Sequence, residues 1–128
     1  MRLKQVSVFL ENQPGHLIRV CKVLAQANVN LITISIAETK DFGVMRLIVD
    51  DPEKAKEALS NAKISCKLID VLSIEVANKA GSFLEILERA QAEKLNIEYA
   101  YAMPSQTPES SVMILKFEDI LAAEKLFK

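Results

Sequence analysis

The stretch Glu11-Asn12-Gln13-Pro14-Gly15-His16-Leu17 joins an apolar run at residues 6–10 to a run with helical spacing at residues 17–27. Gly15 allows backbone angles that a side chain would disfavour, and it lets another group approach closely. A helix that begins at this turn directs its free N–H groups and its positive dipole end towards the turn. The stretch is therefore a candidate binding site for a carboxylate or another anion.

The chain contains this turn twice. Three residue pairs share an offset of 66 positions: Gly15 with Gly81, Asn12 with Asn78, and Asn30 with Asn96. The apolar residues of the first run also recur at this offset, as Leu72, Ile74 and Val76. A fixed internal period indicates repeated copies of one structural module. We expect two modules, residues 1–70 and 71–128, with almost no linker between them.

The first module has the pattern strand, helix, strand, strand, helix, strand. We expect strands at residues 4–10, 31–36, 44–49 and 64–69, and helices at residues 16–27 and after the helix-capping residue Asp51. Residues 40–43 have the composition of a hairpin connection, and the apolar third strand is expected to be covered on both faces. This order predicts an α+β fold of the ferredoxin-like β-α-β-β-α-β type.

The second module repeats the order but ends early. We expect strands at residues 71–77, 97–103 and 112–117, and helices at residues 82–94 and 119–127. After the second hairpin loop, residues 104–110, the offset between the copies becomes 68, so that Lys128 matches Ser60. The second module therefore lacks its last strand. Either the protein was shortened, or another segment fills that sheet edge, because an unfilled edge invites aberrant pairing.

Composition excludes several classes of function. The 128 residues are 50% hydrophobic and carry a net charge of −1 with both signs interspersed, which argues against a nucleic-acid partner. There is no long apolar run and no secretory leader, so we expect neither a membrane span nor export. Cys21 and Cys66 form no metal-ligand pair, and we interpret them as buried, reduced thiols of a cytoplasmic protein. No metal or cofactor is expected.

The repeated motif resembles a known family. The pattern Asn12-x-Pro14-Gly15-x-Leu17, followed by Asn28-Val29-Asn30-Leu31 at the next strand, resembles the signature of the ACT domain. The pattern Asn78-x-Ala80-Gly81-x-Phe83, followed by Leu95-Asn96-Ile97, is similar to a second copy in which Ala80 replaces proline. The whole chain resembles the stand-alone tandem ACT-domain proteins of bacteria and archaea.

The resemblance implies a regulatory, non-catalytic module that binds an amino acid or a similar small carboxylate at an interface between paired ACT units. The ligand would meet the glycine turn and first helix of one unit and the start of the second strand of the other. One implied site combines Asn12, Gln13, Pro14, Gly15, His16 and Leu17 with Asn96 and Ile97. The reciprocal site combines Asn78, Gly81, Ser82 and Phe83 with Asn30, Leu31 and Ile32.

Other interpretations remain open at this point. The glycines can serve turn geometry alone, and Asn12 and Asn78 can simply cap their turns. His16 is the only histidine, and no nucleophile lies near it in sequence, which makes a small ferredoxin-like enzyme the weaker alternative. A protein–protein interaction module without a ligand is the other alternative. We also expect a homodimer, because the open edge and the apolar third strands need cover.

Overall fold

The computed structural model describes residues 1–11, 13–38 and 42–128, and the chain forms two compact units. The first unit comprises Lys4–Ile69, and the second unit comprises Met1–Leu3 together with Asp70–Lys128. Asn12 and the first two residues of the expected hairpin at residues 40–43 lie outside the described residues. No helix of the described part of the chain is long and apolar enough to cross a membrane.

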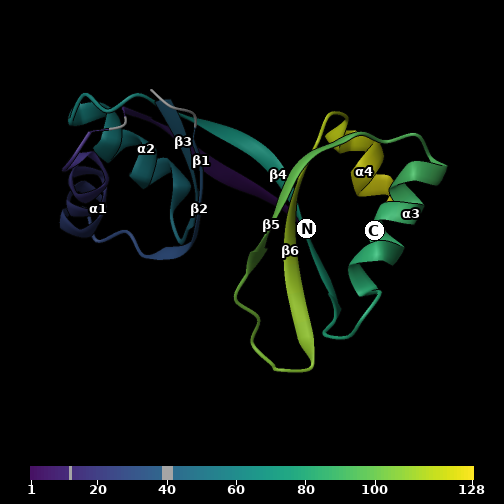
Figure 1. Cartoon of the computed structure of the whole chain (residues 1–128). Coiled ribbons are helices and arrows are strands. Elements are labelled where there is room, and N and C mark those ends of the chain that lie inside the picture. Colours follow the sequence, from purple (N-terminus) through teal and green to yellow (C-terminus); the bar gives the residue numbers. More distant parts are fainter. Residues whose placement is uncertain (12, 39–41) are drawn as a thin grey trace. The chain divides into compact units, whose positions relative to one another are not determined.

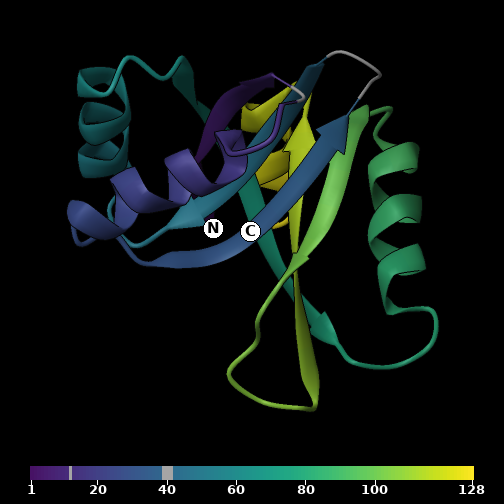
Figure 2. The same ribbon diagram turned by 60° about the vertical axis from the view of Figure 1, so that its left-hand side comes forward.

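The first unit has a sheet with two helices on one face (Figures 1 and 2). Its elements are β1 (Arg2–Glu11), α1 (His16–Gln26), β2 (Leu31–Glu38), β3 (Phe42–Val49), α2 (Pro52–Asn61) and the beginning of β4 (Cys66–Ala77). The strands follow the order β2-β3-β1-β4, and β3 pairs antiparallel with both of its neighbours. The central place of β3 accounts for its almost continuous apolar sequence.

The core of the first unit lies between this sheet and its helices. Alternate residues of β1, namely Val6, Val8 and Leu10, point into it. The helices contribute Val20, Leu24, Ala55 and Leu59, which recur at helical spacing. The expected ends of the helices are also confirmed. The Asp51 carboxylate accepts a hydrogen bond from the Lys54 N–H at 3.2 Å, and Asn28 after α1 has a φ of 58°.

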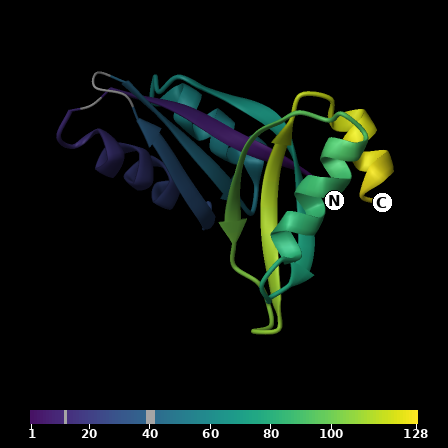
Figure 3. The same cartoon turned by 45° about the vertical axis from the view of Figure 1, so that its right-hand side comes forward.

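The second unit repeats the arrangement with α3 (Ser82–Ala92), β5 (Ile97–Met103), β6 (Ser110–Phe117) and α4 (Ile120–Leu126). Its sheet has the order β1-β4-β6-β5, and both helices cover one face (Figure 3). The Asp119 carboxylate accepts a hydrogen bond from the Ala122 N–H at 3.1 Å. The Phe127 ring packs on Phe117 with 5.9 Å between centroids, and the Arg89 guanidinium lies 4.7 Å above the Phe127 centroid. The prediction of two ferredoxin-like modules is confirmed.

Within the described residues no strand follows α4 in the second unit, and the N-terminal residues take part of the place that β4 has in the first unit. The Ser73 N–H donates to the Met1 carbonyl, and the Met1 amino group donates to the Ser73 carbonyl, both at 2.8 Å. Met1–Leu3 therefore lie beside β4 in the position that β4 itself has beside β1 in the first unit. The sequence left two explanations open, and the second applies in part. A segment from elsewhere in the chain, Met1–Leu3, covers part of this sheet edge.

Two expectations from the sequence were wrong. Gln5 and Ser7 alternate with Val6, Val8 and Leu10, a pattern that predicts a half-buried strand with these two polar residues on its solvent face. Both side chains are buried instead, and the Gln5 amide donates to the Ser7 hydroxyl at 2.9 Å. A hydrogen-bonded polar pair tolerates burial because each group has a partner in place of water. Cys21 was expected in the core but is exposed on α1, because its position faces away from Val20 and Leu24. Cys66 is half-buried.

Candidate functional site

The glycine turn of the first unit has the geometry that its sequence predicts. Gly15 has a φ of 87° and a ψ of −10°, a left-handed conformation that glycine adopts at little cost. Its carbonyl accepts the Arg19 N–H at 3.0 Å, which starts α1. A β-carbon built at Gly15 would meet no heavy atom within 4 Å. The backbone angle, and not the packing around it, therefore requires glycine here.

His16 fixes the turn from the helix side. Its Nδ1 accepts a hydrogen bond from the Glu11 N–H at 2.9 Å, and so links the start of α1 to the end of β1. The Gln13 N–H donates to the Glu11 carbonyl at 2.8 Å within the same turn. These bonds link the end of β1 to Gln13 and to the start of α1.

A groove of about 650 Å³ opens beside this turn, and we call it the turn groove. Its lining comes from the end of β1, the turn, the first turns of α1, the start of β3 and the connection between α2 and β4. The lining residues are Phe9, Leu10, Glu11, Gln13, Pro14, Gly15, His16, Arg19, Phe42, Lys63, Ile64 and Ser65. All of them belong to the first unit. A smaller hollow of about 160 Å³ adjoins it, with Leu17 and Ile36 among its lining residues.

The charges of the turn groove favour a ligand that carries both an anionic and a cationic group. Arg19 reaches it from α1 and Lys63 from the connection after α2, and among the described lining residues Glu11 provides the only carboxylate. The Arg19 guanidinium also donates to the Ala62 carbonyl, which positions it against the α2–β4 connection. Phe9 and Phe42 are 55% and 65% exposed and provide apolar surface beside the charges. The groove thus offers partners for a carboxylate, an ammonium group and an apolar side chain.

The structure brings together only part of the residue set that the ACT resemblance implied. Gln13, Pro14, Gly15 and His16 line the turn groove, and Leu17 lines the adjoining hollow. Asn30, Leu31 and Ile32 lie at the start of β2. The pairing registers set the turn beside Phe42 and Gly43, at the other end of β2 from these three residues. The set therefore does not converge within the first unit.

The corresponding residues of the second unit mostly have structural contacts. The Asn78 amide donates to the Pro108 carbonyl at 3.0 Å and so holds the hairpin loop. Ser82 is buried, and Phe83 and Ile97 pack against the core of the second unit. The Asn96 amide donates to the Glu118 carboxylate at 3.3 Å. Gly81 repeats the left-handed angle of Gly15 with a φ of 88°. The combination of the first turn with Asn96 and Ile97, and its reciprocal, join different units and stay predictions.

Sequence reasoning missed the cations and aromatic residues of the turn groove. Arg19 has an outward position in the helical pattern, which by itself indicates only a solvated charge, and Lys63 lies far from the turn in sequence. One signal could have drawn attention to Arg19: the position 66 residues later is Glu85, so the two copies differ in charge beside the same turn. This difference in charge gives a ligand different surroundings at the two turns.

Comparisons with known proteins agree with the fold. A crystal structure of a protein from Bacteroides thetaiotaomicron matches with a TM-score of 0.92 and 35% identity, over 98% of this chain and 86% of that chain. The ligand-free regulatory subunit of aspartate kinase from Thermus thermophilus matches with a TM-score of 0.67 and 18% identity, over 97% of this chain and 87% of that chain. This second likeness shows the fold alone.

One curated relative also matches, the acetolactate synthase small subunit of Buchnera aphidicola subsp. Baizongia pistaciae (strain Bp). It is 31% identical over 74 residues, which is 58% of this chain and 46% of the relative. The match thus spans about half the length of that relative. The model of the family described as the ACT domain pair matches residues 1–120. With two glycine turns and four helices in the repeated order among its described residues, the chain belongs to the ACT domain pair family.

Proposed function

We propose that this chain is a non-catalytic regulatory protein that binds an amino acid or a similar small carboxylate in the turn groove. The observation that carries the proposal is the convergence of Arg19 and Lys63, two cations 44 positions apart in sequence, beside the Gly15 turn. Salt links between a carboxylate and such cations are the stronger class of hydrogen bond. Membership of the ACT domain pair family supports a regulatory use of this site.

The chemistry of the groove suits an α-amino acid in one orientation. Its carboxylate would lie against Arg19 and Lys63, and its ammonium group would lie against Glu11. The ligand side chain would then face the exposed rings of Phe9 and Phe42. This arrangement uses each lining feature once and leaves no charge of the ligand without a partner, which is the condition for burying a zwitterion.

The contacts of His16 support a non-catalytic function. Its Nδ1 accepts the Glu11 N–H and is therefore occupied in holding the turn. The proton of the neutral ring is then on Nε2, which can donate but not accept, whereas a general base needs an unprotonated ring nitrogen directed at the proton that it removes. The structural use of His16 makes the binding function the better interpretation of this groove.

The proposal extends to assembly and location. We propose a homodimer, supported by the edge strands β2 and β5 and by exposed Ile32, Ile34 and Ile36 on β2. The implied contribution of Asn96 and Ile97 from another module would complete the site, and ligand binding would favour one pairing geometry over another. Light scattering at micromolar concentration tests the dimer, and a monomer without ligand would contradict it.

For the location of the protein we propose the cytoplasm, because the free thiols of Cys21 and Cys66 are typical of a reducing compartment.

Isothermal titration against the twenty amino acids tests the ligand. We expect selective binding by the native chain, and a loss of about tenfold or more in affinity for Arg19→Gln and for Lys63→Gln, because each removes a charged hydrogen-bond donor. Lys56→Gln on α2 is the matched control and should bind normally, since Lys56 does not line the groove. Binding that is insensitive to both groove substitutions would place the ligand elsewhere.

The alternative of an interaction module without a ligand is favoured by the exposure of Phe9 and Phe42, because exposed aromatic residues are enriched in protein interfaces. The same titration separates the two functions. A folded chain that gives no heat with any amino acid, and that loses a protein partner on Phe42→Ser, would support the interaction module.

A further inference from the structure

Two exposed phenylalanines are neighbours on one face of the first sheet. Phe9 alternates along β1 with residues that point into the core, so its ring lies on the opposite face. In the pairing of β1 with β3, Phe9 is opposite Val44. Two positions further along β1, Glu11 is opposite Phe42. Because directly opposite residues share a face, Phe9 and Phe42 are diagonal neighbours, close enough for aromatic side chains to reach each other.

The second unit has the same strand pairing at these positions but different side chains. Glu75 takes the position of Phe9, at the offset of 66 that relates β4 to β1. Ser110 takes the position of Phe42, at the offset of 68 that relates β6 to β3. The same fold thus forms with a charged side chain and a small polar side chain at these two places. The fold does not require the two rings, and exposed apolar surface of this kind is typical of a binding site.

The charged residues of the turn groove differ between the two copies together with the rings. Ala77 takes the position of Glu11. Glu85 takes the position of Arg19, so the first turn of α3 is acidic where that of α1 is not. Rings and charges are therefore present as a set in one copy and absent as a set from the other. One ligand that contacts every member explains such a set, whereas a partner protein that covers only the rings does not require the charges.

We propose that the turn groove selects an α-amino acid with an aromatic side chain, and that each chain binds one such ligand, at its first unit. The inference rests on the proposed function, which places the carboxylate of the ligand against Arg19 and Lys63 and its ammonium group against Glu11. From Glu11 the side chain of the ligand extends along the same face of the sheet onto Phe9 and Phe42. Pairs of aromatic rings stabilise a complex beyond the effect of the area that they bury.

The turn of the second unit lacks the groups that would hold this ligand. Glu85 at the start of α3 repels a carboxylate that approaches the turn. The Asn78 amide is occupied by the Pro108 carbonyl, to which it donates at 3.0 Å. With glutamate and serine at the positions of the two rings, an aromatic side chain finds no stacking partner there. The binding stoichiometry should therefore be one ligand per chain.

Isothermal titration with matched ligands tests the selectivity. L-phenylalanine and L-cyclohexylalanine have the same carbon skeleton, but only the ring of L-phenylalanine is aromatic. We expect L-phenylalanine to bind at least about fivefold more tightly than L-cyclohexylalanine or L-leucine, at one ligand per chain. L-phenylalanine that binds no more tightly than the two aliphatic ligands would overturn the proposal, as would two ligands per chain.

A double variant tests whether the two rings provide the selectivity. Phe9→Leu combined with Phe42→Leu keeps the apolar surface but removes both rings, and the second unit shows that the fold does not depend on them. This variant should bind L-phenylalanine and L-cyclohexylalanine equally. Leu121→Ala is the matched control, because Leu121 is 63% exposed but does not line the turn groove, and it should keep the preference. A preference that survives in the double variant would overturn the proposal.

Arg19→Gln separates this inference from the proposed function. It should weaken the binding of every amino acid that enters the turn groove, whatever its side chain. If an aliphatic or acidic amino acid binds most tightly and loses affinity on Arg19→Gln, the proposed function holds and the aromatic selectivity is wrong. If no amino acid binds, or if Arg19→Gln has no effect on binding, the proposed function is wrong and this inference is overturned with it.

Discussion

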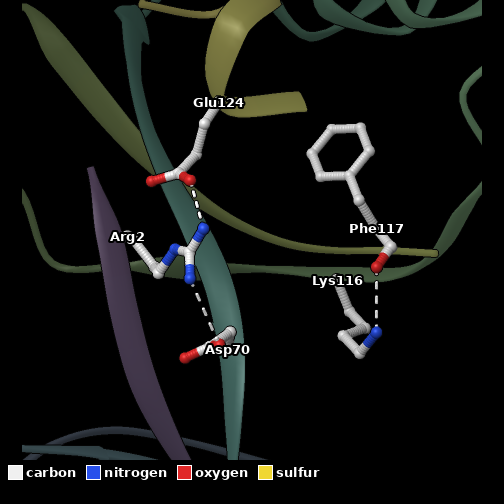
Figure 4. Close-up of polar contacts among 5 residues, drawn as sticks. All are labelled: Arg2, Asp70, Lys116, Phe117 and Glu124. Atoms are coloured by element: carbon white, nitrogen blue, oxygen red, sulfur yellow. Dashed lines mark hydrogen bonds and ion pairs between the residues drawn. The ribbon is translucent and has the colours of Figure 1, made fainter. Parts of the chain in front are cut away.

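Arg2 and Glu124 form an ion pair that joins the second residue of the chain to the last helix (Figure 4). The Arg2 guanidinium also reaches the Asp70 carboxylate at 3.5 Å. All three residues belong to the second unit, so the pair fixes Met1–Leu3 beside β4. A strand segment of three residues has few main-chain hydrogen bonds of its own, and these side-chain contacts add to its stability.

The ion pair predicts a pH-dependent contribution to stability. The hydrogen bond from Arg2 lowers the pKa of Glu124, and the same hydrogen bond raises the pKa of Arg2. A lowered pKa in the folded state gives stability that is fully present above the pKa of the unfolded chain, about 4.3 for glutamate, and that is lost as pH falls through the folded value. Arg2→Gln should therefore lower the thermal midpoint at pH 7, and the difference from the native chain should shrink on acidification below pH 4.

Lys22→Gln, which removes an exposed charge from α1, controls for the change in net charge. Thermal unfolding of the three chains across this pH range is the measurement. A midpoint difference for Arg2→Gln that persists unchanged at low pH would show that the side chain acts by packing and not through Glu124.

The two glycine turns predict similar costs of substitution for one physical reason. Gly15 and Gly81 have φ angles of 87° and 88°, and a β-carbon at either position would meet no heavy atom within 4 Å. Substitution by alanine should therefore cost only the strain of a left-handed conformation, about 1–2 kcal/mol of unfolding free energy. Urea denaturation measures this cost. Asn should cost less than Ala at both positions, since it tolerates this conformation better. A larger loss for Asn than for Ala would contradict the argument.

The fold was predictable because it depends on local pattern and on repetition. Alternation in β1, helical spacing in α1 and the caps Asp51 and Asp119 each gave an element at nearly its observed place. The repeat at one offset then gave the tandem architecture. The burial of Gln5 was not predictable, since a buried hydrogen bond to Ser7 depends on packing that no local pattern describes.

The site was predictable only where it is continuous in sequence. The turn from Gln13 to His16 was identified and does line a groove. Lys63 reaches that groove only because the α2–β4 connection returns beside α1, which is a tertiary arrangement. Phe9 and Phe42 similarly come together through the antiparallel pairing of β1 with β3, in which Phe42 is opposite Glu11. Such residues carry no common motif, and their convergence appears only in the folded chain.

His16 predicts an effect on the local dynamics of the turn. Its Nδ1 accepts the Glu11 N–H at 2.9 Å, so His16→Ala should leave that amide without its partner. The loss should be about 1 kcal/mol or less, because the bond is exposed and water can replace it. Amide hydrogen exchange at Glu11 should become several-fold faster, while exchange at Val20 in α1 stays unchanged. Unchanged exchange at Glu11 would show that the imidazole does not hold the turn, and would return His16 to the set of groups free for chemistry.

The two thiols predict different reactivities towards a disulfide reagent. Cys21 is exposed on α1, whereas Cys66 is half-buried, and its burial raises the pKa of the thiol despite the hydrogen bond from Ser60 and the charge of Lys56. Because the thiolate is the reacting form, Cys66 should react more slowly than Cys21 at pH 8, by about tenfold or more. Cys21→Ser should remove the fast phase and Cys66→Ser the slow phase. Because the first unit must loosen to expose the last strand, mild urea should speed the slow phase selectively. A fast phase that survives Cys21→Ser would show that Cys66 is accessible, and that the last strand of the first unit packs less firmly than its contacts with the core indicate.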